Sequence, residues 1–236
     1  MPSTLDDLAG LVATRLPPAG PHLVGLAGAV AVGKSTIARE LAARLDSGGR
    51  HVDVVPTDAF LQPNTLLAER DLLYRKGFPE SFDTDALGAF VRDVKAGAQI
   101  LTIPVYSHVE YDIEPDRTAT LRDPDVVILE GVLALQPPAV DSLDVAIYVD
   151  AAEADVRSWF CDRFLTLVAQ ARTEAAAFYR MFADMNDEQV RSVAEGTWDA
   201  INGPNLSEHI APSRANASIV VRKNGDHTIA RIASLT

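Results

Sequence analysis

Residues 28–35, GAVAVGKS, place two glycines, a lysine and a serine at the spacing G-x-x-x-x-G-K-[ST]. Backbone N–H groups of such a loop can point inward around a polyphosphate, and Gly28 and Gly33 allow approaches that a Cβ would forbid. Lys34 would bring positive charge to the terminal phosphates, and Ser35 would offer a hydroxyl to Mg²⁺. The alternative is an ordinary strand–turn–helix connection with Lys34 in water. Because the segment follows an apolar run and precedes an amphipathic one, nucleotide binding is favoured.

Two carboxylates follow apolar runs elsewhere in the chain, Asp58 after VVPT and Glu130 at the end of VVILE. A phosphate-binding loop alone does not separate a kinase from a GTPase or a motor ATPase, but the N-K-x-D guanine signature does not occur. Open parallel sheets bind ligands beyond the carboxyl ends of their strands. We therefore predict that Asp58 is the general base for an acceptor hydroxyl and that Glu130 lies near Mg²⁺. The alternatives are a helix N-cap for Asp58 and a loop salt bridge for Glu130.

Strand and helix patterns alternate along the chain, which predicts an α/β fold with a mainly parallel sheet. Extended segments are expected at residues 22–28, 51–58, 100–113, 125–131, 143–151 and 217–226. Helices are expected at residues 4–16, 34–45, 83–97, 151–172 and 187–202, with a short helix and a loop within 66–83. We see no linker, so residues 1–236 are expected to form one domain.

The composition limits the possible partners. The net charge of −12 disfavours nucleic acid and anionic lipid, whereas a local pocket of N–H groups can still bind a small phosphorylated ligand. The single cysteine, Cys161, excludes an internal disulfide and a cysteine-based zinc site. The N-terminal stretch is acidic and amphipathic, unlike a secretory signal, and no apolar run is long enough to span a membrane. We therefore expect a cytoplasmic protein.

Several longer segments closely resemble the type I (bacterial) pantothenate kinase family, within the P-loop kinases that include uridine kinase and phosphoribulokinase. The resemblance runs from about residue 22 to the C-terminus and is carried by GAVAVGKST, TDAFLQPN, RKGFPESFD, VYSHVEYDI, DVVILEGVLALQ, WFCDRF, INGPNLSEHIAPSRA and GDHTI. It implies a three-layer P-loop fold, a helical acceptor and lid segment at about 151–202, and a possible homodimer. It also implies transfer of the γ-phosphoryl group of ATP, with Mg²⁺, to the primary hydroxyl of pantothenate in coenzyme A biosynthesis.

The resemblance assigns roles residue by residue. The implied catalytic residues are Asp58, Lys34 and Arg163, and the metal would lie at Ser35 and Glu130. The implied ATP-binding residues are Gly28, Ala29, Val30, Ala31, Val32, Gly33, Lys34, Ser35, Thr36 and His227. The implied acceptor residues are Tyr106, His108, Tyr111, Phe160, Tyr179, Phe182 and Asn205. Ordinary alternatives are strand packing for the tyrosines, a surface imidazole for His108 and a helix-surface charge for Arg163.

Four places depart from the family pattern: Ala59 replaces a glycine, Leu133 an asparagine, Phe160 a tyrosine, and the aromatic order within 178–182 is changed. A methyl group at Ala59 could crowd the acceptor. Lost polar groups change substrate discrimination strongly, since each unsatisfied partner costs about 1–3 kcal/mol. Two other functions therefore stay open: a related kinase for a nucleoside, sugar or other small alcohol, and a nucleotide-binding paralogue without catalysis.

Overall fold

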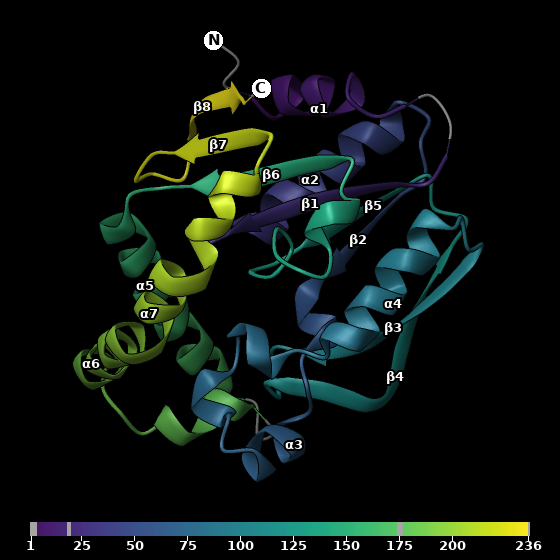
Figure 1. Cartoon of the computed structure of the whole chain (residues 1–236). Helices are drawn as coiled ribbons and strands as arrows, with labels where there is room; N and C mark the ends of the chain where they lie inside the picture. Colours follow the sequence, from purple (N-terminus) through teal and green to yellow (C-terminus); the bar gives the residue numbers. More distant parts are fainter. Residues whose placement is uncertain (1–3, 18–19, 174–176, 236) are drawn as a thin grey trace.

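The fold is organised around a six-stranded sheet with the order β2-β5-β1-β6-β7-β8 (Figure 1). A computed structural model describes residues 4–17, 20–173 and 177–235. In spatial order the strands are β2 (Val52–Pro56), β5 (Val126–Glu130), β1 (His22–Gly28), β6 (Val145–Asp150), β7 (Ile219–Lys223) and β8 (Ile229–Ser234). All neighbours are parallel except β8, which runs antiparallel to β7. This sheet confirms the predicted α/β class.

Helices cover both faces of the sheet, which gives three layers (Figure 1). The larger helices are α1 (Leu5–Ala13), α2 (Lys34–Ser47), α3 (Asn64–Glu69), α4 (Thr84–Lys95), α5 (Glu153–Ala171) and α6 (Asp187–Thr197). Strand β1 shows how the layers arise, because successive side chains of a strand point to opposite faces. Leu23 and Ala27 pack in the core beneath α4, whereas Val24 and Leu26 pack in the core beneath α1 and α2.

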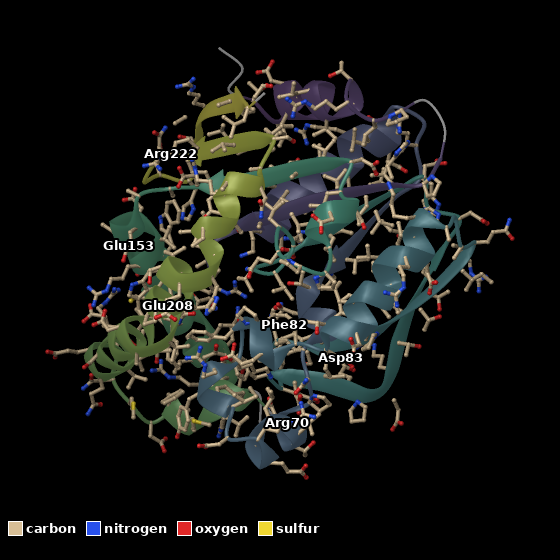
Figure 2. All side chains as sticks on the ribbon, in the orientation of Figure 1. Arg70, Phe82, Asp83, Glu153, Glu208 and Arg222 are labelled. Carbon is tan, nitrogen blue, oxygen red and sulfur yellow. The ribbon has the colours of Figure 1, made fainter. Side chains whose placement is uncertain are left out.

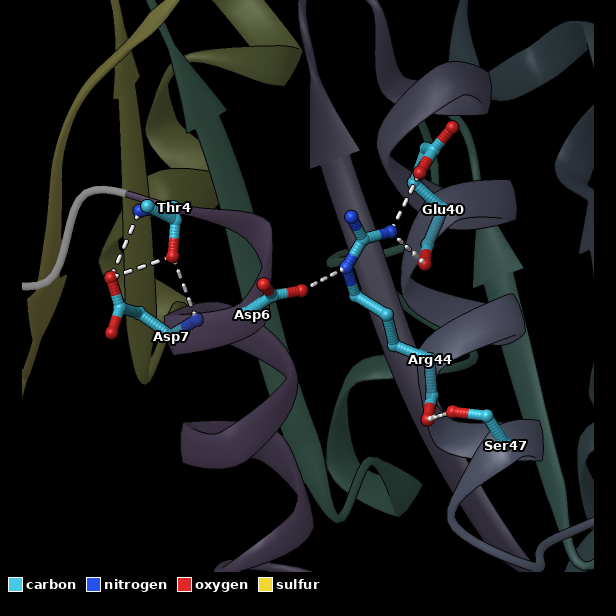
Figure 3. A network of polar contacts seen from close by, with 6 residues as sticks. All are labelled: Thr4, Asp6, Asp7, Glu40, Arg44 and Ser47. Carbon is cyan, nitrogen blue, oxygen red and sulfur yellow. Dashed lines mark hydrogen bonds and ion pairs between the residues drawn. The ribbon is translucent and has the colours of Figure 1, made fainter.

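Helix α1 is fastened to α2 at the molecular surface (Figure 3). Thr4 and Asp7 form a capping box that satisfies the first N–H groups of α1. Arg44 of α2 donates to Asp6 and to Glu40, with both N–O distances 2.6 Å. These contacts hold α1 beside the helix that follows the phosphate-binding loop.

A second sheet of two antiparallel strands, β3 (Ile100–Ser107) and β4 (Asp112–Arg122), extends from the main body (Figure 1). The sequence predicts extended chain only to residue 113, so most of β4 is not foreseen. Its residues DIEPDRTATLR are largely polar and half-buried or exposed, and they lack the apolar alternation that indicates a strand. Pairing with β3 is what makes this segment extended.

The helical segment after β6 begins with α5 and α6, close to the expected ranges 151–172 and 187–202. The chain then continues through residues 198–210 without leaving helical backbone, in two π-helical turns on either side of α7 (Gly203–Asn205). The π-helical turns are η6 (Trp198–Asn202) and η7 (Leu206–Ile210), and the 3₁₀ turns are η1 (Thr57–Phe60), η2 (Leu73–Arg75), η3 (Pro79–Ser81), η4 (Val140–Ser142), η5 (Phe178–Phe182) and η8 (Pro212–Asn216). None of the helices in the described ranges is long and apolar enough to cross a bilayer.

Candidate active site

The register of three parallel strands brings the predicted chemical groups to one edge of the sheet. Glu130, the last residue of β5, pairs with Leu26 of β1 on one side and with Pro56 of β2 on the other. The phosphate-binding loop begins at Gly28, two residues beyond Leu26, and Asp58 lies two residues beyond Pro56. The loop and both carboxylates are therefore neighbours at the carboxyl edge, where open α/β sheets bind ligands.

The loop itself has the backbone geometry that its glycines permit. Gly28 and Gly33 have φ angles of 151° and 94°, and a Cβ on Gly28 would lie 2.5 Å from the carbonyl oxygen of Val149. Helix α2 begins at Lys34, so the N–H groups of its first turn and the positive end of its dipole face the loop. The ammonium of Lys34 donates to the carbonyl of Ala29 at 2.9 Å across the loop. This arrangement suits a polyphosphate, whose oxygens would accept hydrogen bonds from the Lys34 ammonium and from the unsatisfied N–H groups.

Three charged groups surround Lys34. Burial lowers the pKa of its ammonium, the carboxylates of Glu130 and Asp58 oppose that shift, and the nearby guanidinium of Arg163 adds to it. Glu130 is 7% exposed and accepts a hydrogen bond of 2.7 Å from the hydroxyl of Ser35. The carboxylate of Glu130 therefore engages Ser35 rather than a loop cation. Asp58 lies in the turn η1, which has no side-chain cap, so the N-cap alternative does not describe it.

The Ser35–Glu130 pair matches the way proteins hold Mg²⁺. Among the residues that the structure describes, no cluster of three or more His, Cys, Asp or Glu side chains suits a metal ion. Mg²⁺ is usually bound by one or two protein oxygens together with substrate phosphates and water, so a hydroxyl and one carboxylate at the loop fit its preferences.

Aromatic side chains form a cluster that includes Tyr106, Tyr111 and Phe178. Tyr111 stacks on Phe178 with ring centroids 4.5 Å apart, and the Tyr106 ring lies 5.2 Å from that of His108. Burial raises the pKa of Tyr106 and of Tyr111, and the Asp58 carboxylate raises both further. That influence places Asp58 within electrostatic reach of this aromatic cluster.

The helical segment supplies the remaining rings of the cluster. Tyr179 and Phe182 of η5 both pack against Phe164 of α5, with centroids 5.1 and 5.5 Å apart. Burial raises the pKa of Tyr179, and Arg163 opposes the shift, so the guanidinium lies within electrostatic reach of both Tyr179 and Lys34. Exposed Arg163 thus reaches both the phosphate-binding loop and the aromatic cluster, which a purely surface charge would not.

Asn205 of α7 contacts the segment that carries Lys76. It is 6% exposed and donates to the carbonyl of Gly77 at 2.8 Å, while its side-chain oxygen has no hydrogen-bond partner in the described chain. Buried polar atoms are nearly always hydrogen-bonded in native proteins. The free acceptor oxygen therefore suits the hydroxyl or amide N–H of a ligand.

Lys76 is a site residue that the sequence analysis does not single out. It is 7% exposed, and its ammonium donates to Asn64 Oδ1 and to the carbonyl of Tyr111, both at 2.6 Å. It also lies over the rings of Tyr106 and Tyr111, at 5.0 and 4.4 Å from their centroids. Burial lowers its pKa to about 8, against the pull of Asp112 and Asp58. The signal in the sequence is the lysine of RKGFPESFD, a segment that carries the family resemblance.

Two of the sequence departures lie in the core. Ala59 is 1% exposed and Leu133 is 1% exposed, and both pack in the core beneath α4. Ala59 also borders a cleft of about 470 Å³ together with Arg70, Phe82 and Asp83 (Figure 2). None of the predicted acceptor residues lines that cleft. Crowding of the acceptor by the methyl of Ala59 stays a prediction.

Phe160 joins the aromatic cluster through Phe164, whereas His227 packs against a different ring. Phe160 packs against Phe164 and Trp198, with centroids 6.1 and 5.7 Å apart. His227, in the β7–β8 turn, stacks on Trp159 of α5 at 4.1 Å. Their roles toward the acceptor and adenine stay predictions.

Comparison with known proteins decides the family. Residues 23–159 match the model of the phosphoribulokinase / uridine kinase family. The chain belongs to the phosphoribulokinase / uridine kinase family. This membership makes it an ATP-dependent small-molecule kinase with the P-loop fold.

Individual members of the phosphoribulokinase / uridine kinase family resemble it over most of its length. It is 46% identical to a pantothenate kinase of Cutibacterium acnes over 225 residues, which cover 90% of this chain and 69% of the relative. It is 47% identical to a pantothenate kinase of Mycobacterium sp. strain KMS, covering 90% of this chain and 70% of the relative. Among solved structures, a putative fructose transport system kinase from Silicibacter sp. TM1040 is similar with a TM-score of 0.71 and 28% identity, covering 91% of this chain and 94% of that one.

Proposed function

We propose that the chain phosphorylates the primary hydroxyl of pantothenate with ATP and Mg²⁺, the reaction named by its pantothenate kinase relatives. The observation that carries this proposal is the placement of Asp58. Its carboxylate acts electrostatically on Lys34 of the phosphate-binding loop and on Tyr106 and Tyr111 of the aromatic cluster. A base that removes a proton from an acceptor must lie between the phosphoryl donor and the acceptor, and these two influences support that role for Asp58.

Each step follows from a side chain at the site. Asp58 takes the proton of the acceptor hydroxyl while the oxygen of that hydroxyl bonds to the γ-phosphorus of ATP. The bond from that phosphorus to the β–γ bridging oxygen breaks, and ADP leaves. Lys34 and Arg163 stabilise the negative charge on the transferring group. Ser35 and Glu130 would hold Mg²⁺, which neutralises phosphate charge when bound.

The acceptor pocket proposed here suits an anionic hydroxy-amide. Pantothenate carries a carboxylate, an amide and a primary hydroxyl, so it needs positive charge and hydrogen-bonding groups between apolar walls. Lys76 supplies the buried cation, Asn205 the unsatisfied oxygen, and Tyr111 with Phe178 an aromatic wall. A nucleoside or a neutral sugar would bring no further negative charge to the Lys76 ammonium.

The test is a coupled ADP-release assay with pantothenate, uridine and fructose at matched ATP and magnesium. We expect turnover with pantothenate, and loss of about 10²–10⁴-fold in kcat for Asp58→Asn with ATP affinity unchanged. Asp85→Asn, at the exposed start of α4, is the matched control and should keep full activity. Lys34→Ala should weaken both ATP binding and turnover.

Two results would contradict the proposal. Turnover with uridine or fructose but not pantothenate would indicate the related-kinase alternative, and tight ATP binding without turnover on any acceptor would indicate a non-catalytic paralogue. Activity of Asp58→Asn within a few-fold of the wild type would remove Asp58 as the base. A homodimer stays a prediction, and sedimentation velocity of the wild-type chain tests it.

A further inference from the structure

Lys223, the last residue of β7, reaches the phosphate-binding loop from behind. It is 8% exposed, and its ammonium donates to the carbonyl of Val32 at 2.9 Å. Its neighbour Arg222 points to the opposite face of the strand, lies at the molecular surface (Figure 2) and pairs with Asp150 at 2.7 Å. Two adjacent cations of one strand therefore have different environments.

The Lys223 ammonium is buried without an opposite charge in the part of the chain that the structure describes. Burial lowers its pKa, and no carboxylate counters the shift. Its other neighbour is the face of Trp159, with the ring centroid 5.3 Å away. Burying a cation costs free energy unless an anion compensates it. An anion bound on the other side of the loop would offset the cost of keeping the Lys223 ammonium charged.

The hydrogen bond from Lys223 to the Val32 carbonyl also fixes the direction of the next N–H group, that of Gly33. In a trans peptide the C=O and the N–H point in opposite directions. Because Lys223 binds the carbonyl of Val32, the N–H of Gly33 is directed away from Lys223. A Cβ on Gly33 would lie 2.8 Å from the Lys223 ammonium, so a side chain at residue 33 would displace it.

We propose that Lys223 is a positioning residue of the nucleotide site, which fixes the Val32 carbonyl so that the loop N–H groups face the phosphates and adds positive charge behind them. The proposal rests on the ATP-binding function proposed above and deepens it. The charge favours ligands that carry a β-phosphate, because the loop of P-loop enzymes cradles the β- and γ-phosphates.

Trp159 supports Lys223 and connects it to the turn after β7. The indole N–H donates to the carbonyl of Gly225 at 3.2 Å, and the indole stacks on His227. The indole thus holds the turn between β7 and β8 against α5. Lys223, Trp159 and His227 form one packed unit beside the loop.

Calorimetric titration with ATP, ADP and AMP tests this role in the full-length wild type, Lys223→Met and Lys223→Arg. We expect Lys223→Met to bind ATP and ADP about tenfold to a hundredfold more weakly, the effect of losing a charged hydrogen bond. AMP affinity and the KM for the acceptor should stay within twofold, and Lys223→Arg should recover most of the loss. Lys95→Met, the same substitution in the ion pair with Asp144 at the opposite edge of the sheet, is the control and should bind like the wild type.

A merely structural role would give different results. In that case Lys223→Met would lower the unfolding temperature of the nucleotide-free protein and would weaken AMP binding as much as ATP binding. Our proposal predicts little change in the unfolding temperature or in AMP affinity. If Lys223→Met does not fold, Lys223→Gln gives the same readout. Unchanged ATP and ADP affinity in a folded neutral variant overturns the proposal, whereas a wild type that binds no ATP overturns the proposed function instead.

Discussion

Lys76 gives the sharpest prediction, because its pKa of about 8 falls within the range of enzyme assays. If the ammonium form binds the anionic acceptor, kcat/KM for pantothenate should follow the protonated fraction. That fraction is about 90% at pH 7 and about 3% at pH 9.5, so kcat/KM should fall about thirtyfold between the two. Carboxylates do not titrate in this window, and the raised pKa values of Tyr106 and Tyr111 keep both phenols neutral.

The assay is ADP release at saturating ATP and magnesium, with pantothenate varied at each pH. Lys34 also has a lowered pKa, so the variant Lys76→Met is needed to separate the contributions of the two lysines to the pH profile. Lys76→Met should have a low kcat/KM at pH 7 and should lose the thirtyfold fall. A flat wild-type profile, or an equally steep profile in Lys76→Met, would refute a role for the Lys76 charge.

The same shift has a consequence for stability. The pKa of Lys76 is lower in the folded state than the ordinary 10.5, so between pH 8 and 10.5 the unfolded chain binds more protons. The free energy of unfolding should therefore rise with pH in that window. The penalty below pH 8 is at most about 3 kcal/mol by the size of the shift, and solvent at the mouth of the pocket reduces it. Lys76→Met relieves this penalty but removes the donor to Asn64 Oδ1, whereas the Tyr111 carbonyl keeps its hydrogen bond from Asn64 Nδ2, so activity should fall much more than stability.

Three further substitutions test other contacts. Glu130→Gln should raise the Mg²⁺ concentration for half-maximal activity about tenfold, measured by magnesium titration at fixed ATP, and an unchanged requirement would contradict a metal role. Gly131→Ala would place a Cβ 1.8 Å from the Thr57 hydroxyl, so urea unfolding should show a loss of more than about 2 kcal/mol; Gly196→Ala, with open space around it, is the control and should not destabilise. Ala59→Gly should destabilise by about 1 kcal/mol with no change in the acceptor KM, and a clear fall in that KM would show that the methyl does crowd the acceptor.

The main sheet was predictable because its signals are local. Central parallel strands such as β1 and β5 are apolar on both faces, and their runs are visible without any partner. The hairpin strand β4 and the edge strand β8 were not predicted, because exposed strands have mixed sequences and become extended only by pairing with β3 and β7.

The sequence by itself determined the chemistry at the strand ends. The spacing of Gly28, Gly33, Lys34 and Ser35, and carboxylates directly after apolar runs, follow from how a parallel sheet exposes its carboxyl edge. These features depend on a few consecutive residues, so no knowledge of distant contacts is needed to propose them.

Only the tertiary structure decided which other charges belong to the site. Lys76 and Lys223 look like ordinary surface lysines in the sequence, yet packing buries one beside Tyr111 and the other behind Val32. Ala59, whose replacement of glycine pointed to the acceptor, is buried in the core beneath α4. Burial and electrostatic influence depend on side chains brought together from distant segments, and that information is absent from any single stretch of the chain.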